Sequence, residues 1–205
     1  MFGSFFSAKK EILKLGDHVS DATIGVVRGS KNLGENHKTP YFRMNAIGRE
    51  GSFSYSGLKK GTFDQDELKK YSMETGDLLF NTRNSQELVG KTTVLQEKIE
   101  GVYNNNILRV RFTERLNSNF IDYYLRTSIG QRELNLRKSG TTNVFAIYQK
   151  SFFDIPIVAT PENLQIKFAT NISSITNQKN IYSKSLANIE NLFVSLQQRA
   201  FRGEL

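Results

Sequence analysis

The sequence predicts an α+β fold in which a globular domain, residues 1–158, precedes a long helix within residues 159–205. Three observations support this prediction. Short apolar segments bounded by glycine, asparagine, serine and threonine recur through the first part of the chain. One segment there, residues 117–137, has apolar spacing typical of a helix. After Pro161 the chain has no proline and its only glycine is Gly203, so a helix can run almost to the last residue.

The elements of the globular domain follow from local patterns. Strands are predicted where apolar segments lie between turn residues, at residues 41–47, 77–81, 91–95 and 106–112. The helix at residues 117–137 has Asn117 or Ser118 as its cap. Its shared face would comprise Phe120, Tyr124, Ile129 and Leu134. Tyr103 and Phe145 are expected to be core residues rather than platforms for base stacking.

The C-terminal helix carries apolar residues at alternating steps of four and three, which is the spacing of a coiled coil. Lys179 interrupts the series and Ala200 ends it. Such a helix would be about 58 Å long, which is more than a domain of this size can cover, so a partner helix is predicted. The alternative is a helix folded onto its own domain. The predicted contact residues are Phe168, Ile172, Ile175, Tyr182, Leu186, Ile189, Phe193 and Leu196.

The charge balance favours a polyanionic partner. The chain has 28 Lys and Arg against 20 Asp and Glu, a net charge of +8. Residues 1–161 hold 23 of the basic and 17 of the acidic side chains, so most of the excess lies in the globular part. Nucleic acid is the commonest polyanionic partner of a basic protein, and a basic charge that serves only solubility is the alternative.

Catalytic and metal chemistry find little support in the residues. Cysteine is absent, which excludes disulfides, thiolate zinc sites and cysteine nucleophiles. His18 and His37 lack the spacing of metal ligands. No Asp/Asn-Pro-Pro-aromatic tetrapeptide of adenine methyltransferases occurs, and Asp77 with Glu97 and Lys98 lacks the residue spacing of a nuclease site. We therefore predict no catalytic residue, no metal and no cofactor on this chain.

No apolar run reaches the 18 or so residues that a membrane span needs. The N-terminal residues lack the pattern of a secretory signal. No membrane contact is predicted, and the expected location is the cytoplasm.

Four stretches follow one another in a familiar order. They are residues 15–17 (LGD), 76–83 (GDLLFNTR), 139–169 (opening with SGTT and containing Ile155-Pro156) and 192–205 (LFVSLQQRAFRGEL). Together they resemble the specificity (S) subunit of type I restriction–modification systems, along nearly the whole chain. A complete S subunit has two target recognition domains and two conserved helices, whereas this chain has one of each. It would therefore be a half-length form, or the C-terminal half of a longer subunit.

The resemblance implies a division of labour. The recognition domain would read one half of a bipartite target in double-stranded DNA, and the helix would act as a spacer and bind the modification (M) subunits. Those subunits would bring S-adenosylmethionine and the methyl transfer, and a restriction (R) subunit would add cleavage. Two copies paired through their helices as a homodimer would supply two recognition domains. An antiparallel coiled coil would place these domains at opposite ends.

Residues that pair donors with acceptors are needed to read bases, and cations and hydroxyls are needed to hold phosphates. Two loops, residues 82–86 and 137–143, are rich in both kinds. The predicted DNA-binding residues are Arg28, Lys31, Arg43, Asn45, Thr82, Arg83, Asn84, Ser85, Lys91, Arg137, Lys138, Ser139, Thr141, Thr142 and Asn143. Two other functions remain open: a dimerisation or adaptor module, and a decoy that sequesters the M subunit.

Overall fold

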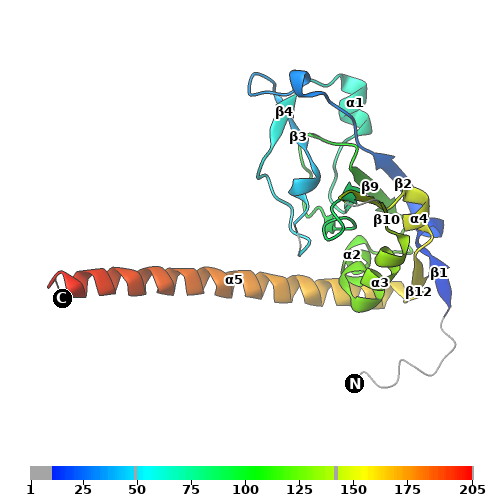
Figure 1. Ribbon diagram of the computed structural model, residues 1–205. Coiled ribbons are helices and arrows are strands. Elements are labelled where there is room, and N and C mark those ends of the chain that lie inside the picture. Colours follow the sequence, from blue (N-terminus) through cyan, green and yellow to red (C-terminus); the bar gives the residue numbers. More distant parts are fainter. Residues whose placement is uncertain (1–10, 49, 141–142, 205) are drawn as a thin grey trace. The chain divides into compact units, whose positions relative to one another are not determined.

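The computed structural model describes residues 11–48, 50–140 and 143–204, and the chain forms two compact units, Met1–Gln165 and Ile166–Leu205 (Figure 1). The division falls inside the long helix α5 (Glu162–Phe201), so the first turn of that helix belongs to the first unit. The predicted domain boundary at residue 158 remains a prediction. Among the residues that the structure describes, no helix has both the length and the apolar character needed to cross a lipid bilayer.

The centre of the first unit is a four-stranded antiparallel sheet with the order β2-β9-β5-β7. Its strands are β2 (Val19–Ile24), β5 (Leu78–Asn81), β7 (Thr92–Val94) and β9 (Ile107–Phe112). Side chains alternate between the two faces of a strand, so Leu78 and Phe80 enter one apolar cluster while Leu79 enters another. Both faces of the sheet are therefore buried, and the strands predicted at residues 77–81, 91–95 and 106–112 are confirmed.

Helices α2 (Ser118–Arg126), α3 (Ser128–Arg137) and α4 (Gln149–Phe153) contribute to the first cluster, in which the rings of Phe80 and Phe152 lie 4.2 Å apart. The pair β1 (Ile12–Lys14) and β12 (Pro156–Val158) closes the unit, with the short helix η1 (Leu15–His18) following β1. Gln165 is almost fully buried in this unit. It accepts a hydrogen bond from the Asn117 N–H (2.9 Å) and donates to the Arg115 and Thr160 carbonyls.

The single helix predicted at residues 117–137 is wrong, although its cap is confirmed. Asn117 Oδ1 accepts a hydrogen bond from the Phe120 N–H at 3.1 Å. The helix stops at Thr127, whose hydroxyl caps a second helix by accepting from the Gly130 N–H at 3.2 Å. A Cβ at Gly130 would lie 2.2 Å from the Tyr124 carbonyl, so only glycine permits this close turn. Ile129 consequently points to solvent instead of joining the predicted apolar face.

A second region of the first unit is built around β3 (Thr39–Phe42), which pairs with β4 (Lys59–Gly61) and β8 (Val102–Tyr103). Figure 1 shows β3, β4 and helix α1 (Gln65–Lys70) together at one end of the unit. Short helices η2 (Ser30–Asn32) and η3 (Met44–Ala46) complete the region. The strand predicted at residues 41–47 is therefore too long. It ends at Phe42, because the Arg43 carbonyl accepts from the Ala46 N–H and starts a helical turn. Tyr103 is fully buried, which confirms it as a core residue.

A buried ion-pair network connects these two regions. Asp77, which is 2% exposed, accepts hydrogen bonds from Arg111 Nε (2.6 Å) and Nη2 (3.0 Å). These hydrogen bonds raise the pKa of the Arg111 guanidinium. Arg109, also buried, lies 3.9 Å from the Asp77 carboxylate, pairs with Asp21 and donates to the Ser72 carbonyl beyond α1. The network therefore joins the central sheet to the segment that follows α1.

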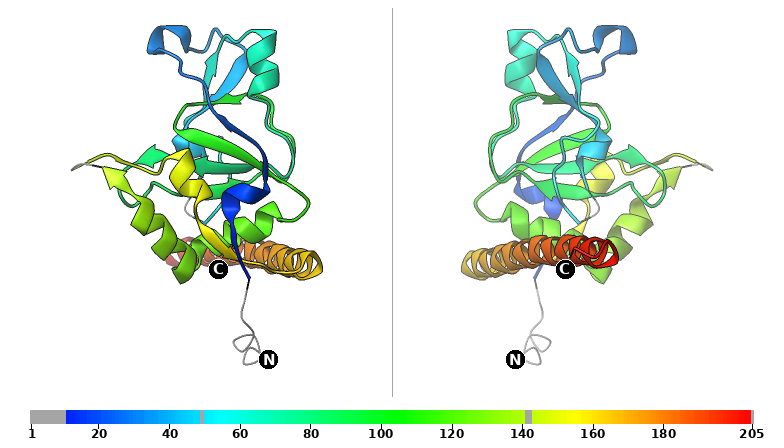
Figure 2. Two further views of the ribbon diagram at one scale, coloured as in Figure 1. Left: turned by 90° about the vertical axis from the view of Figure 1, so that its right-hand side faces the viewer. Right: turned by 90° about the vertical axis from the view of Figure 1, so that its left-hand side faces the viewer.

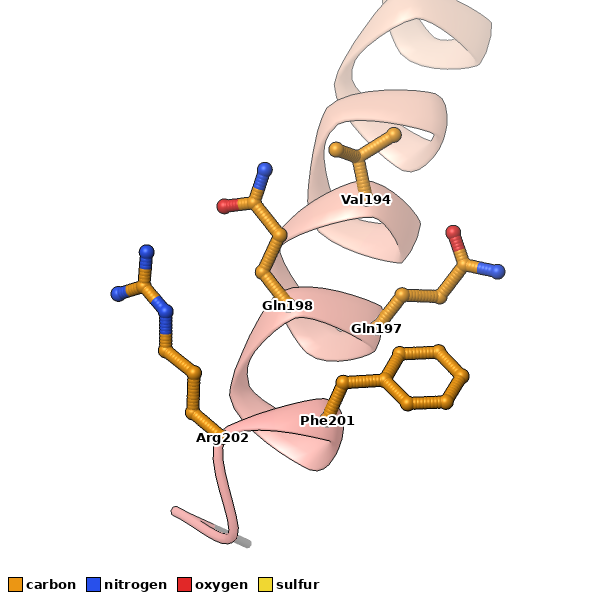
Figure 3. Close-up of a pocket in the computed structure, with 5 residues that line it drawn as sticks. All are labelled: Val194, Gln197, Gln198, Phe201 and Arg202. Atoms are coloured by element: carbon orange, nitrogen blue, oxygen red, sulfur yellow. The ribbon is translucent and has the colours of Figure 1, made fainter.

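Helix α5 has 40 residues and is about 60 Å long. The predicted contact positions Tyr182, Leu186, Ile189 and Phe193 are each more than half exposed. Two apolar side chains outside the predicted series, Val194 and Phe201, also lie on the surface of the helix. They border a shallow hollow of about 390 Å³ (Figure 3). The figure shows Gln197 and Phe201 on one side of it and Gln198 and Arg202 on the other. The long helix is confirmed, and the coiled coil and its direction remain predictions.

Candidate nucleic-acid interface

The two loops predicted to bind DNA, separated by 50 residues in the chain, meet in one small sheet. Strand β11 (Phe145–Ala146) lies between β6 (Arg83–Asn84) and β10 (Ser139–Gly140), and both pairings are antiparallel. One hydrogen bond joins the loops directly, from Lys138 Nζ to the Gln86 carbonyl (2.7 Å), and the Ile147 N–H, just after β11, donates to the Thr82 carbonyl (2.9 Å). The loops therefore form one surface rather than two.

The loop after β6 is held in a defined conformation. The Ser85 N–H donates to Asn84 Oδ1, and the Val89 N–H donates to the Ser85 carbonyl, both at 2.9 Å. At its base, the buried Asn81 donates to the Leu88 carbonyl at 3.2 Å. Gly90, at φ +89°, returns the chain to β7. Arg83 and Ser85 remain exposed on this ordered loop.

Three more predicted residues, Arg43, Asn45 and Lys91, lie beside the first loop. The Thr82 N–H donates to the Asn106 carbonyl (2.8 Å), and the Asn106 amide lies 3.9 Å from the sulfur of Met44, the residue between Arg43 and Asn45. Lys91 Nζ lies 3.5 Å from the Ile47 carbonyl. The Nε of Arg43 is buried and has no hydrogen-bond partner among the described residues.

The remaining predicted residues differ in their surroundings. Arg28 pairs with Glu67 and stacks on Phe63 in the region of β3, where Lys31 lies exposed in η2. Arg137 donates to Glu133 (2.8 Å) and to the Asp154 carbonyl (2.8 Å), so its guanidinium stabilises α3 and α4. Burial lowers the pKa of Lys138. Ser139 and Asn143 are exposed, and Thr141 and Thr142 lie outside the described residues.

The small sheet also presents side chains that the sequence did not point to. Phe145 packs against the main apolar cluster and Ile147 belongs to it, so the alternate residues Val144 and Tyr148 face away from the core, with Ala146, only 9% exposed, between them. Val144 is 52% exposed and Tyr148 is 60% exposed. Figure 2 shows the segment of β10 and β11 projecting from the side of the unit. Residues 144–148 (VFAIY) are all apolar, so the sequence has no alternation of polar and apolar residues that would show which side chains face the core.

Among the described residues, no group of three or more His, Asp or Glu side chains is placed to hold a metal ion. Asp77, the acidic residue considered for a nuclease site, is engaged by Arg111 and Arg109 in the interior.

Comparison with known proteins gives a relative among the specificity subunits of type I restriction enzymes. The chain is 23% identical, over 174 residues, to the type I restriction enzyme EcoKI specificity subunit of Escherichia coli K12, which covers 81% of this chain and 37% of that protein. No protein-family model matches the sequence.

Solved structures show the same fold. The crystal structure of the HsdS subunit from Thermoanaerobacter tengcongensis matches with a TM-score of 0.61 at 20% identity, over 99% of this chain and 47% of that chain. The S subunit of a type I system from M. genitalium matches with a TM-score of 0.58 at 14% identity, over 87% and 42%. A chain from a structural study of type I system assembly gives a TM-score of 0.65 at 20% identity, over 99% and 48%. The chain thus spans less than half the length of each. The predicted resemblance to one half of an S subunit is confirmed.

Proposed function

We propose that this chain is a DNA specificity component of a type I restriction–modification system and reads one half of a bipartite target. Its similarity to S subunits supports this proposal. The observation that carries it is the joining of residues 82–86 with residues 137–140 and 143–146 in one surface through β6, β11 and β10. A single surface of this kind can face one short stretch of duplex.

The chemistry of the surface suits the major groove, in which arginine pairs with guanine and asparagine with adenine. Arg83 and Asn143 supply such groups, while Ser85 and Ser139 supply hydroxyls for phosphates. Asn84 lies opposite Phe145 and accepts from the Ser85 N–H, so it shapes the loop. The DNA contact would extend along the neighbouring sugar–phosphate backbone through Arg43, Asn45 and Lys91. Arg28 and Lys31, in the region of β3, would contact DNA only outside this surface.

The proposed partners are a second copy of the chain and the M subunits, with an R subunit for cleavage. The exposed apolar positions of α5 support a role in protein contact, and Val194 and Phe201 widen that surface beyond one seam. S-adenosylmethionine would bind to the M subunit. An adaptor or a decoy would keep the helix but would not need the polar surface of the small sheet.

Binding to a defined duplex separates these functions. We expect the affinity for target DNA to fall steeply as salt rises, because each neutralised phosphate releases counterions. Fluorescence anisotropy at several salt concentrations measures this slope. An adaptor or decoy would show no preference for any duplex sequence at any salt concentration.

The chain by itself is expected to transfer no methyl group and to cleave no DNA, because its sequence lacks the adenine-methyltransferase tetrapeptide. Incubation with labelled S-adenosylmethionine and plasmid DNA, with no M subunit present, tests this. Labelled DNA or nicked plasmid from the purified chain would contradict the assignment.

Replacing Arg83 with alanine is expected to weaken binding to target DNA by about 1–3 kcal/mol and to change binding to random DNA much less, as for loss of a base contact. The control is Arg132→Ala, because the Arg132 side chain on α3 is 71% exposed and lies outside the small sheet. Equal losses on both duplexes would make Arg83 a phosphate contact, and no loss on either would remove it from the interface.

A further inference from the structure

The outward face of the small sheet combines one cation with apolar side chains. The register sets Ala146 opposite both Arg83 and Ser139, so these three residues share a row across the strands. Val144 and Tyr148 flank this row along the chain and are 52% and 60% exposed. Because Phe145 and Ile147 occupy the core side, Val144 and Tyr148 cannot turn inward without displacing that packing.

The surroundings of this face favour DNA over a protein partner. Residues 82–86 and 138–148 contain Arg83 and Lys138 and no Asp or Glu; the nearest acidic residue along the sequence is Glu87. A polyanion at this face therefore meets Arg83 and no carboxylate from these two segments. A ribbon of β-strands also fits the width of the major groove.

The exposed apolar side chains on this face would be best buried against an apolar group of the ligand. The edge of a base pair in the major groove offers one such group, the C5 methyl of thymine, beside its hydrogen-bonding atoms. Val144 lies two residues from Ala146, which is about 7 Å along the strand and equals about two base steps. A base touched by Val144 would thus lie close to a base touched by Arg83.

Resting on the proposed function, we propose that Val144 is a specificity-determining residue that contacts the C5 methyl group of a thymine near the base contacted by Arg83. Burial of one methyl group corresponds to a roughly fourfold preference for thymine over uracil at that position.

The test uses the full chain and two libraries of random-sequence duplex, one synthesised with thymine and one with uracil in its place. Sequences retained by the chain are read after repeated selection, and the affinities of one enriched duplex in both forms are then measured. We expect a thymine in the enriched sequence, and a roughly fourfold loss of affinity when that thymine alone becomes uracil. Val144→Ala should bind both forms equally, whereas Ile129→Ala, which removes an exposed apolar side chain from α3, should keep the wild-type difference.

The outcomes are distinct. Wild-type protein that binds the thymine and uracil forms equally would overturn the methyl contact and leave the proposed function standing. A Val144→Ala protein that still prefers thymine would also overturn it, by assigning the contact to another residue. Failure to enrich any sequence from either library would overturn the proposed function, and the inference with it. Because the uracil substitution leaves the protein unchanged, the result does not depend on how a variant folds.

Discussion

Asp77→Ala is expected to lower the free energy of unfolding by about 3 kcal/mol, the lower end of the cost of breaking a buried ion pair, because Arg109 and Arg111 lose the buried carboxylate while Arg109 keeps its pair with Asp21. Removing one partner of a buried ion pair costs far more than the pair contributes, since the remaining charge keeps its desolvation penalty. Arg111 would also lose two hydrogen bonds, and the Glu74 N–H would lose its acceptor in the Asp77 carboxylate. Urea denaturation followed by circular dichroism measures the loss.

The matched control makes the same substitution at an exposed ion pair. Asp154 lies 3.3 Å from Lys14, and the two side chains are 49% and 64% exposed. Asp154→Ala should change stability by no more than about 1 kcal/mol, because exposed pairs are solvated whether or not they meet. Equal effects of the two variants would mean that the Asp77 network does not hold the two regions of the first unit together.

The sequence was sufficient for elements whose apolar pattern is continuous. β5, β7 and β9 lie within predicted segments because Leu78–Asn81 and its neighbours are bounded by turn residues. It failed where a polar side chain interrupts a pattern. Thr127 divides one predicted helix into two, because its hydroxyl caps the second helix. In the sequence, the only sign of this break is Thr127 followed three residues later by Gly130, which is a weak signal. Arg43 likewise ends β3, because its carbonyl begins a helical turn.

The candidate interface was predictable in composition but not in geometry. The loops at Arg83 and Ser139 have the residues that DNA contact requires, yet their pairing through β11 is a long-range contact that no local pattern encodes. The same pattern could not separate Arg83, which is exposed, from Arg137, which is engaged by Glu133. Val144 and Tyr148 were missed because an apolar residue in a short strand is exposed or buried according to which face meets the core.

The second large effect concerns α5. Leu186→Asp and Ile189→Asp are each expected to convert a dimer of the full chain into a monomer at micromolar concentrations. Both side chains are more than half exposed in the single chain, so the monomer tolerates the charge. In a paired helix each would bury an unpaired carboxylate in an apolar seam, which costs several kcal/mol. Sedimentation equilibrium of the wild type and the two variants measures the change.

The control is Asn191→Asp, which introduces the same charge on another face of the helix. Residue 191 lies five positions after Leu186, and this places it about 140° around the helix from that side chain. Asn191→Asp should therefore leave the dimer intact.

Dimerisation also has a consequence for DNA, because closed two-fold symmetry of identical chains predicts a target that is an inverted repeat with a fixed gap. A wild-type chain that stays monomeric, alone and with its M subunit, would contradict pairing through α5. The second recognition domain would then have to come from another polypeptide.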